Sequence, residues 1–188
     1  MARRLQRFIK SKSLAVKSIA DVGCGPAIML FELAPRLPYC DFLGFDGSRK
    51  VLNINRWRTT TEGLRNLRFE FARLPEIMTE QRFDIVTCIA ALHYVRESRR
   101  AIRNLYSMLK PGGYLIFNYP NRTQRAAYQR EAQRDPTVKQ RFNLVLSGSN
   151  LLSREVIEST LQQNTESFWS AVGERACWSN PCVAVAKQ

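Results

Sequence analysis

The chain has 188 residues, 45% of them hydrophobic, which suits one domain with a single buried core. No apolar stretch approaches the ~20 residues of a membrane helix, and basic residues interrupt the first twenty positions, so we expect no membrane span, no secretory signal and a cytoplasmic location. The net charge of +13 would attract RNA, an acidic carrier protein or anionic metabolites, although solvated helix faces account for it equally well.

Cysteine and histidine usage indicates neither a disulfide framework nor a metal site. The five cysteines are Cys24, Cys40, Cys88, Cys177 and Cys182. Their number is odd, no C-x-x-C pair occurs, and a chain of this size does not need covalent links. With one histidine, His93, a zinc site would need thiolates or carboxylates at spacings that are absent. We expect reduced, mostly buried thiols and no metal.

Strand and helix patterns alternate along the first two thirds of the chain. A short amphipathic helix is predicted over residues 1–11, within an N-terminal segment of residues 1–17. Apolar and β-branched runs predict strands at residues 18–22, 41–45, 67–71, 83–90 and 114–118. Between them, helices are predicted over residues 26–33 with Pro26 in the first position, after an N-cap at Ser48, and over residues 98–109. A turn is predicted at residues 110–113. This alternation favours a parallel sheet covered on both faces.

The last third of the chain does not continue the alternation of strands and helices. Residues 121–135 are polar and predicted to be helical until Pro136, and residues 142–146 are ambiguous. Ser153 can cap a further helix, and residues 168–172 and 181–186 are predicted to form a closing strand pair. We treat residues 1–188 as a single domain, with residues 121–152 as a substrate cap.

A glycine turn joins the first strand to the first helix after it. Gly23 and Gly25 lack a Cβ atom, so the backbone can approach a ligand closely, and the helix that follows presents unpaired N–H groups. Such turns also occur for structural reasons. Asp46 follows Gly25 by 21 residues at the end of the second strand, where a carboxylate can bind both ribose hydroxyls. The alternative for Asp46 is an acidic turn or helix-cap residue.

Two other kinds of nucleotide ligand, a dinucleotide and a P-loop nucleotide, are disfavoured by the residues that follow the glycine turn. A dinucleotide fingerprint needs a small residue three positions after the second glycine, where the helix packs on the strand, and Ile28 stands there. A phosphate-binding P-loop needs a Gly-Lys-Ser/Thr sequence, and residues 28–30 supply no lysine.

Five segments in a fixed order resemble the class I S-adenosylmethionine-dependent methyltransferases, in the branch that contains many small-molecule enzymes. They are residues 19–26, 44–48, 83–86, 91–95 and 109–115. The resemblance covers residues 15–120 strongly and the last helix and strand pair more weakly. It implies an α/β, three-layer Rossmann-like fold with a seven-stranded, mostly parallel sheet in the order 3-2-1-4-5-7-6, in which strand 7 is antiparallel.

The resemblance also implies a cofactor, S-adenosylmethionine, and a set of residues around it. The glycine turn would surround the methionine end, Asp46 would bind the ribose, and residues after the fourth strand would line the sulfonium. The implied cofactor-binding residues are Asp21, Gly23, Cys24, Gly25, Asp46, Gly47, Ser48, Ala72, Arg73, Ile89 and Ala90. Many members have an aspartate after strand 3, whereas this chain has Phe71-Ala72-Arg73, so the adenine must be held by backbone groups or apolar stacking.

The methyl acceptor is less clearly indicated. His93, past the fourth strand, is the candidate general base, with a local orienting role as the alternative. Tyr94 and Tyr119 stand at neighbouring strand ends and could form walls of the substrate site or simple packing. The segment after the fourth strand, residues 89–92, lacks the Asn/Asp-Pro-Pro-aromatic sequence of base-amino methylation, and Cys88, inside a strand, is better explained as core than as a nucleophile.

Three functional hypotheses follow. The leading one is methyl transfer to a small metabolite or natural product, anionic in one version, with arginines of the cap receiving it. The second is methylation of RNA or another anionic macromolecule, suggested by the +13 charge. The third is a non-catalytic cofactor-binding protein of the same fold. The acceptor atom and the oligomeric state are open.

Overall fold

Residues 1–168 and 181–188 are described by the computed structural model, and their central feature is a sheet in the order β3-β2-β1-β4-β5-β7-β6. The strands are β1 (Ser18–Val22), β2 (Asp41–Asp46), β3 (Leu67–Phe71), β4 (Phe83–Cys88), β5 (Leu109–Asn118), β6 (Glu166–Ser167) and β7 (Cys182–Ala186). The strands from β3 to β5 pair in parallel, and β7 is antiparallel to both of its neighbours. The predicted fold class and strand order are therefore confirmed.

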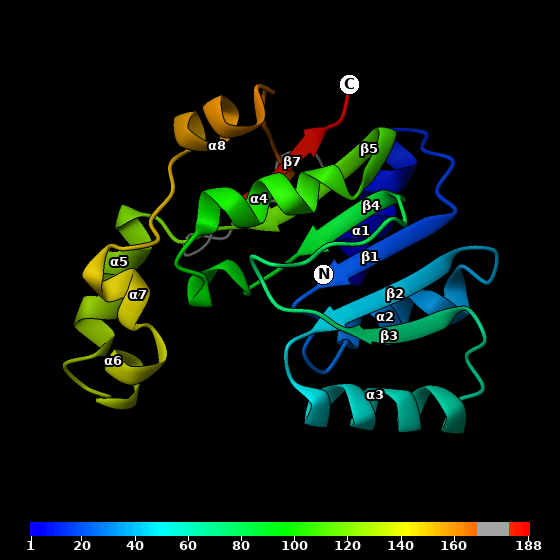
Figure 1. Ribbon diagram of the computed structural model, residues 1–188, viewed down its shortest axis with the longest axis horizontal. Helices are drawn as coiled ribbons and strands as arrows, with labels where there is room; N and C mark the ends of the chain where they lie inside the picture. The colour runs from blue at the N-terminus through cyan, green and yellow to red at the C-terminus, as the bar shows by residue number, and fades with distance from the viewer. Residues whose placement is uncertain (169–180) are drawn as a thin grey trace.

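Helices cover both faces of this sheet and extend past one end of it (Figure 1). The helices are α1 (Ala2–Ser11), α2 (Ile28–Leu33), α3 (Arg49–Thr61), α4 (Ser98–Ser107), α5 (Arg122–Glu131), α6 (Thr137–Arg141), α7 (Asn143–Ser147) and α8 (Arg154–Leu161), with short 3-10 turns η1 (Ala34–Arg36) and η2 (Leu92–Tyr94). Helices α5, α6 and α7 lie beyond the carboxyl ends of the parallel strands, on the left of Figure 1. We call this group the cap.

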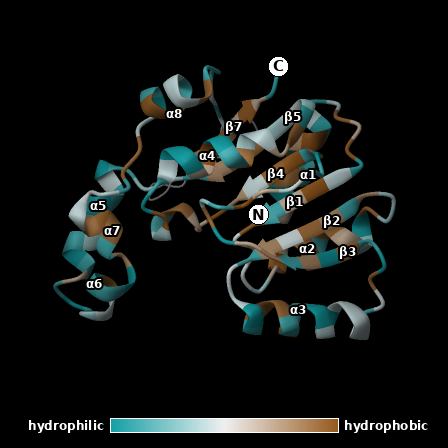
Figure 2. Cartoon of the chain, in the orientation of Figure 1, coloured by the Kyte–Doolittle hydropathy of each residue, from teal (hydrophilic) through white to brown (hydrophobic). Residues whose placement is uncertain are grey.

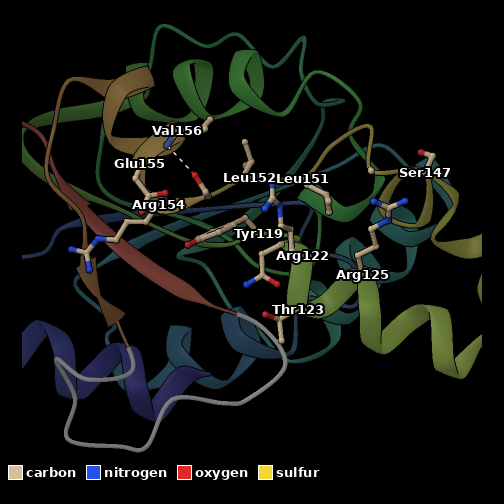
Figure 3. Close-up of a pocket in the computed structure, with 13 residues that line it drawn as sticks. Tyr119, Arg122, Thr123, Arg125, Ser147, Leu151, Leu152, Arg154, Glu155 and Val156 are labelled. Atoms are coloured by element: carbon tan, nitrogen blue, oxygen red, sulfur yellow. Dashed lines mark hydrogen bonds between the residues drawn. The ribbon is translucent and has the colours of Figure 1, made fainter.

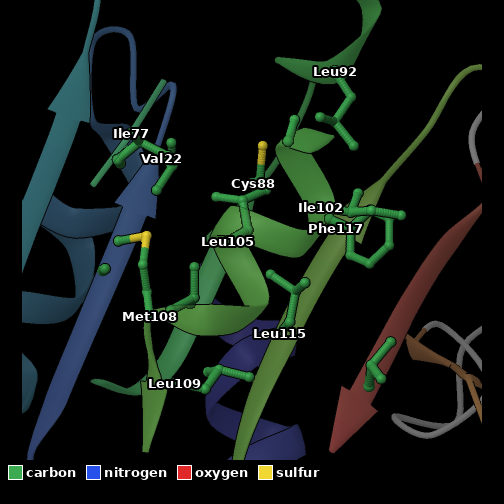
Figure 4. Close-up of a cluster of buried hydrophobic side chains, with 14 of the residues drawn as sticks. Val22, Ile77, Cys88, Leu92, Ile102, Leu105, Met108, Leu109, Leu115 and Phe117 are labelled. Atoms are coloured by element: carbon green, nitrogen blue, oxygen red, sulfur yellow. The ribbon is translucent and has the colours of Figure 1, made fainter. Parts of the chain in front are cut away.

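Side-chain alternation along the strands builds two separate cores. Ile19 packs into one core with α1 and α2, whereas its neighbour Ala20 packs into the other with α4 and α8. Because both faces are buried, the central strands carry apolar residues on both sides, and much of β1 and β4 is brown in Figure 2. Figure 4 shows the core beneath α4, where Ile102 and Leu105 lie over Leu115. The two cores hold the sheet rigid, so the ends of its strands are fixed platforms for a site.

The predicted caps of two helices are confirmed. The Ser48 hydroxyl accepts a hydrogen bond from the N–H of Val51, and that of Ser153 from the N–H of Val156. The first helix after β1 begins later than predicted. Pro26 is not its first residue, because the residues on both sides of it, Gly25 and Ala27, have positive φ angles of 51° and 52°, and a helix cannot include such residues. The helix therefore starts at Ile28.

The predicted bounds of the fourth and fifth strands also need correction. The fourth ends at Cys88 and not at residue 90, because Ala90 turns the chain with a φ angle of 60°. The predicted turn at residues 110–113 lies inside β5 as an irregularity, since Phe83 pairs with Leu109 and Ile85 next pairs with Tyr114. The helix predicted to end at residue 109 ends at Ser107, because Leu109 already belongs to β5.

In the last third, the cap helices are shorter than predicted. The helix that begins at Arg122 ends at Glu131 and not at residue 135, and the ambiguous residues 142–146 fall largely in α7. The strand that pairs with β7 before the chain end is Glu166–Ser167, so the predicted start at Phe168 was too late. Residues 169–172 of that prediction lie outside the described residues, as does Cys177.

Two expectations from composition can be compared with the described residues. Four cysteines, Cys24, Cys40, Cys88 and Cys182, are free and buried there. Burial raises the pKa of the Cys40 thiol to about 12, so this thiol stays protonated and unreactive near neutral pH. Within the described residues no helix is both long and apolar enough to cross a bilayer.

Candidate cofactor and acceptor site

The glycine turn after β1 is fastened to the end of β2. The N–H groups of Gly23 and Cys24 both donate to the carbonyl of Phe45, over 2.8 and 3.0 Å. Gly23 has a φ angle of 74°, and a Cβ atom added to it would lie 2.4 Å from the Cβ of Ala91. The turn therefore requires glycine at position 23, both for backbone conformation and because the loop after β4 packs directly against it.

Asp46 organises this turn through both of its carboxylate oxygens. Oδ2 accepts a hydrogen bond from the N–H of Gly25 at 2.9 Å, and Oδ1 accepts one from the N–H of Ser48 at 2.8 Å. A carboxylate has about four acceptor positions, so these two bonds leave room for two hydroxyl donors from a ligand. Asp46 can therefore hold the turn, as the alternative interpretation proposes, and still have acceptor positions for the two ribose hydroxyls.

Asn55 of α3 also holds the turn and was not expected from the sequence. Its side chain is 2% exposed, and its Nδ2 donates to the carbonyl of Gly25 over 2.8 Å. Asn55 lies three residues after Leu52, on the buried face of an amphipathic helix. A polar residue on an apolar helix face is the signal that could have identified it, since buried amides need a hydrogen-bond partner.

A pocket of about 400 Å³ lies between this turn and the loop after β4, within the size range of small-molecule sites, roughly 300–1,000 Å³. Eight predicted site residues line it: Gly23, Gly25, Asp46, Gly47, Ala72, Arg73, Ala90 and Tyr94. Four further lining residues were not predicted: Val22, Leu74, Ala91 and Val95. Four of the predicted cofactor-binding residues do not line it, namely Asp21, Cys24, Ser48 and Ile89, and neither do His93 and Tyr119, which were predicted for the acceptor side. The pocket thus forms largely where the sequence placed it.

Three of the predicted cofactor-binding residues outside the pocket, Asp21, Cys24 and Ser48, support the elements that form it. The Asp21 carboxylate is 6% exposed and accepts a hydrogen bond from the Thr87 hydroxyl at 2.7 Å, which joins β1 to β4. Burial raises the pKa of Asp21 to about 6, the bond from Thr87 opposes this rise, and the charge of Asp46 adds to it. The Cys24 thiol packs against Gly44, and Ser48 is the helix cap described above.

The loop after β4 forms the opposite wall and is held by Asn118 at the end of β5. Ala90 adopts a left-handed conformation, and its N–H donates to Oδ1 of Asn118 over 2.6 Å. Asn118 is 5% exposed, so this amide is a buried brace between neighbouring strand ends. A polar residue at the end of the apolar run 115–117 was the sequence signal for it.

At the end of β3 the ring of Phe71 contacts two arginines, of which Arg73 lines the pocket. The Arg49 guanidinium lies 4.4 Å and that of Arg73 lies 5.5 Å from the ring centroid of Phe71. The aliphatic part of Arg73 also lies close to Gly47, where an added Cβ would be 3.0 Å from Cγ. This region offers apolar side chains and backbone groups where the resemblance puts adenine.

His93 lies under the cap and does not line the cofactor pocket. The imidazole is 2% exposed, and its Nε2 is 2.9 Å from Oε1 of Gln124 in α5. The side chain of Asn150, which follows the cap, donates to the carbonyls of Leu92 and His93 at 3.1 and 3.0 Å. These bonds tie η2 to both ends of the cap.

Tyr94, by contrast, connects the pocket to the cap. Its side chain is 50% exposed, and its ring stacks on Phe142 with centroids 5.7 Å apart. Phe142 stacks in turn on Tyr128 at 4.2 Å, and Nε of Arg141 donates to the Tyr94 hydroxyl at 3.2 Å. Tyr119, the other predicted substrate residue, lines a separate, larger cavity. The structure therefore places Tyr94 in the wall of the pocket beside the glycine turn and Tyr119 in the wall of the other cavity.

The strand order, the glycine turn and the acidic residue that ends β2 define a Rossmann-like nucleotide-cofactor protein with the sheet of class I methyltransferases. The family model described as "Methyltransferase domain" matches residues 15–168. The chain belongs to this methyltransferase family. The resemblance inferred from the five sequence segments is thereby confirmed.

Two curated relatives of the chain are O-methyltransferases. The chain is 32% identical over 115 residues to the ubiquinone biosynthesis O-methyltransferase of Acinetobacter baylyi, covering 60% of this chain and 48% of that protein. It is 30% identical over 166 residues to the protein of the same name from Coxiella burnetii, covering 87% and 68%. The chain spans about half the length of the first of these relatives.

Solved structures agree on the fold. CalS10 from Micromonospora echinaspora, an amino pentose methyltransferase determined with bound SAM, is 26% identical, with a TM-score of 0.53 over 62% of this chain and 48% of that one. The plantazolicin methyltransferase BpumL, determined with SAH, has a TM-score of 0.72 over 100% of this chain and 82% of that one, at 14% identity. The second likeness concerns the fold alone.

Proposed function

We propose that this protein transfers the methyl group of S-adenosylmethionine to a hydroxyl oxygen of a small-molecule acceptor. The observation that carries the proposal is the pocket in which Asp46 faces the glycine turn, in a chain of the methyltransferase family. The names of the relatives support oxygen as the acceptor atom and a small molecule as the acceptor.

The residues present fit this cofactor. Gly23 and Gly25 leave the turn free of side chains, and an added Cβ at Gly25 would meet no atom within 4 Å, so a ligand has space there. The remaining acceptor positions of Asp46 suit the two hydroxyls of a ribose. The aliphatic part of Arg73 and the side chain of Leu74 supply apolar surface for a purine base.

S-adenosylmethionine, when bound, supplies a methyl group made electrophilic by the adjacent sulfonium. The chain has to bind the cofactor and the acceptor, orient them toward each other and exclude water. This is chiefly catalysis by proximity. Asp46 and the turn hold one end of the cofactor, and the braced loop at Ala90 and Ala91 forms the wall that faces it. Tyr94, between the pocket and the cap, is the side chain best placed to contact an acceptor.

For His93 the geometry supports a positioning role. Its imidazole is buried against Gln124, Tyr128 and Phe142, and it fixes η2, which carries Tyr94 into the pocket. The role of general base remains a prediction, to be separated from positioning by a pH profile.

Cofactor binding is tested by calorimetry with S-adenosylhomocysteine. We expect saturable binding that weakens at least ~10-fold in Asp46→Ala, because charge-assisted hydrogen bonds are lost. Asp41→Ala is the matched control, since Asp41 is an exposed aspartate at the other end of the same strand. An absence of binding to the wild-type protein would contradict the proposal.

Transfer itself is tested with labelled cofactor, a panel of small hydroxyl compounds, and a total RNA pool. Label on a small acceptor supports the proposal. Label on RNA alone would favour the macromolecular alternative, and binding without any transfer would favour the non-catalytic one.

A further inference from the structure

A second cavity, of about 820 Å³, lies beside the end of β5 (Figure 3). Its walls come from the start of α5, the segment that follows α7, and the start of α8, and Tyr119 lines it at the end of the sheet. It shares no lining residue with the cofactor pocket. The two are nevertheless neighbours, because Asn118, which precedes Tyr119, is bonded to Ala90 in the wall of the cofactor pocket.

The charged residues of this cavity are three arginines and one glutamate: Arg122, Arg125, Arg154 and Glu155. Arg154 is already engaged, since its Nε lies 3.0 Å from Oε1 of Glu158 and a terminal nitrogen donates to the carbonyl of Thr165. Hydrogen bonds from Ser153 and from its own backbone N–H lower the pKa of Glu155, which therefore serves the start of α8. The net charge of the side chains that line the cavity therefore stays positive, because of Arg122 and Arg125.

Arg122 and Arg125 have no acidic partner among residues 1–168 and 181–188. Arg125 is oriented by a bond from its Nε to the carbonyl of Leu146 at 2.9 Å, which leaves its terminal nitrogens for another acceptor. One of these nitrogens lies 3.2 Å from where a Cβ of Gly148 would be, on the cavity wall. In Figure 3 the Arg122 guanidinium lies near Leu151 and Leu152, and that of Arg125 lies toward Ser147.

The start of α5 adds backbone donors to the same wall. Asn121 caps the helix by accepting a bond from the N–H of Gln124 at 2.8 Å. The N–H groups of Arg122 and Thr123 precede any intrahelical acceptor, and none of the described residues accepts from them. Two planar guanidinium groups and two free N–H groups at a helix start form a donor set suited to a carboxylate or a phosphate.

We propose that this cavity binds the acid group, carboxylate or phosphate, of the methyl acceptor, with Arg122 and Arg125 as its ligands. The proposal rests on the proposed function, in that the rest of such an acceptor would reach past Tyr119 and Asn118 toward the loop at Ala90. It defines the acceptor as an anionic small molecule and gives part of the +13 charge a specific use.

The test is a titration of the protein saturated with S-adenosylhomocysteine, followed by the backbone amide signals of Arg122 and Thr123. The probes are benzoate, phenyl phosphate and the neutral benzamide. We expect the two amide signals to shift saturably with at least one acid and not with benzamide. Whichever acid binds more tightly identifies the acid group. Equal binding of benzamide, or no saturation by either acid, would overturn the proposal.

Variants locate the binding. We expect Arg122→Gln with Arg125→Gln to weaken acid binding at least ~10-fold, and Arg122→Gln alone to weaken it less. Arg130→Gln, at the exposed last turn of the same helix and outside the cavity, is the matched control and should bind as the wild type does. Unchanged acid binding in the double variant would refute the assignment. S-adenosylhomocysteine affinity is measured in parallel, so failure of cofactor binding, which bears on the proposed function, is distinguished from failure of acid binding.

Discussion

Oδ1 of Asn118 accepts a hydrogen bond from the backbone N–H of Ala90 over 2.6 Å, and this bond joins the end of β5 to the loop after β4, which forms a wall of the pocket. Because Ala90 is a non-glycine residue in the left-handed region, its conformation has to be maintained by its surroundings. The wall of the pocket that Ala90 and Ala91 form therefore depends on one buried amide.

We expect Asn118→Ala to lower the rate of methyl transfer strongly while S-adenosylhomocysteine affinity changes less. Loss of the acceptor removes this hydrogen bond, whose net contribution is about 0.5–1.5 kcal/mol, so the loop at Ala90 is no longer held in place. Steady-state kinetics and calorimetry on the same preparation check this.

Asn66→Ala is the control for that experiment. Its Nδ2 donates to the carbonyls of Ala34, Leu37 and Cys40, which hold no part of either cavity. This variant should lose stability but keep its turnover at a temperature where it is folded. Equal loss of turnover in both variants would show that the effect of Asn118 is only one of general stability.

Gly23→Ala should abolish cofactor binding and destabilise the fold. The new Cβ would lie 2.4 Å from that of Ala91, in a backbone with a φ angle of 74°, so either the turn or the loop after β4 must move. Overpacking of this kind costs roughly 1–3 kcal/mol. Gly63→Ala is the control. Its φ angle is 66° and no atom lies within 4 Å of the added carbon, so it has the cost of a positive φ angle without a steric contact. Urea unfolding of both variants measures the difference, and equal losses would refute the role given to the contact with Ala91.

Asp21 should make stability depend on pH in an identifiable way. Its pKa is raised by burial from 3.8 to about 6, so the folded protein binds a proton here more readily than the unfolded chain does. The folded state is therefore penalised at high pH, and this penalty disappears as the pH falls through 6 toward 4.

Asp21→Asn removes this titration and keeps an oxygen that can accept the bond from Thr87. We expect its stability relative to the wild type to rise between pH 4 and pH 7, by about 3 kcal/mol at most. Urea unfolding of both proteins at several pH values gives this difference directly. A constant difference across the range would mean that Asp21 does not titrate as stated.

His93→Ala and Gln124→Ala should have similar effects if the imidazole positions η2. Each variant breaks the 2.9 Å contact between Nε2 and Oε1 and loosens the link from Tyr94 to the cap. We expect both to lower kcat, with unchanged affinity for S-adenosylhomocysteine and an unshifted pH profile of kcat. Loss of an ionisation from that profile in His93→Ala alone would instead assign it as the general base.

The sequence predicted the sheet and most of the cofactor pocket because both depend on strong local signals. Apolar runs defined the parallel strands, and glycines at a strand end together with Asp46 indicated the nucleotide turn. The argument from Ile28 was wrong in its geometry, since that side chain is 63% exposed and does not pack against the strand. Its conclusion, that the cofactor is not a dinucleotide, stands on the family match.

Other parts of the site had no local signal. Ala91 and Val95 line the pocket because Ala90 turns the chain, and nothing about an alanine predicts a left-handed conformation. The direction in which His93 points depends on how α5 returns over η2, a contact between segments some thirty residues apart. Such features follow from tertiary packing, which periodicity and spacing do not encode.

The two ends of the cap meet the rest of the protein at nearly the same place. The chain enters the cap from β5 just after Asn118, whose side chain holds Ala90. It leaves the cap through Asn150, whose amide donates to the carbonyls of Leu92 and His93. The cap is therefore attached to the rest of the protein in a single region. We therefore expect that another set of helices can replace residues 122–147 without unfolding the sheet, provided that Asn118 and Asn150, which anchor the cap, are kept.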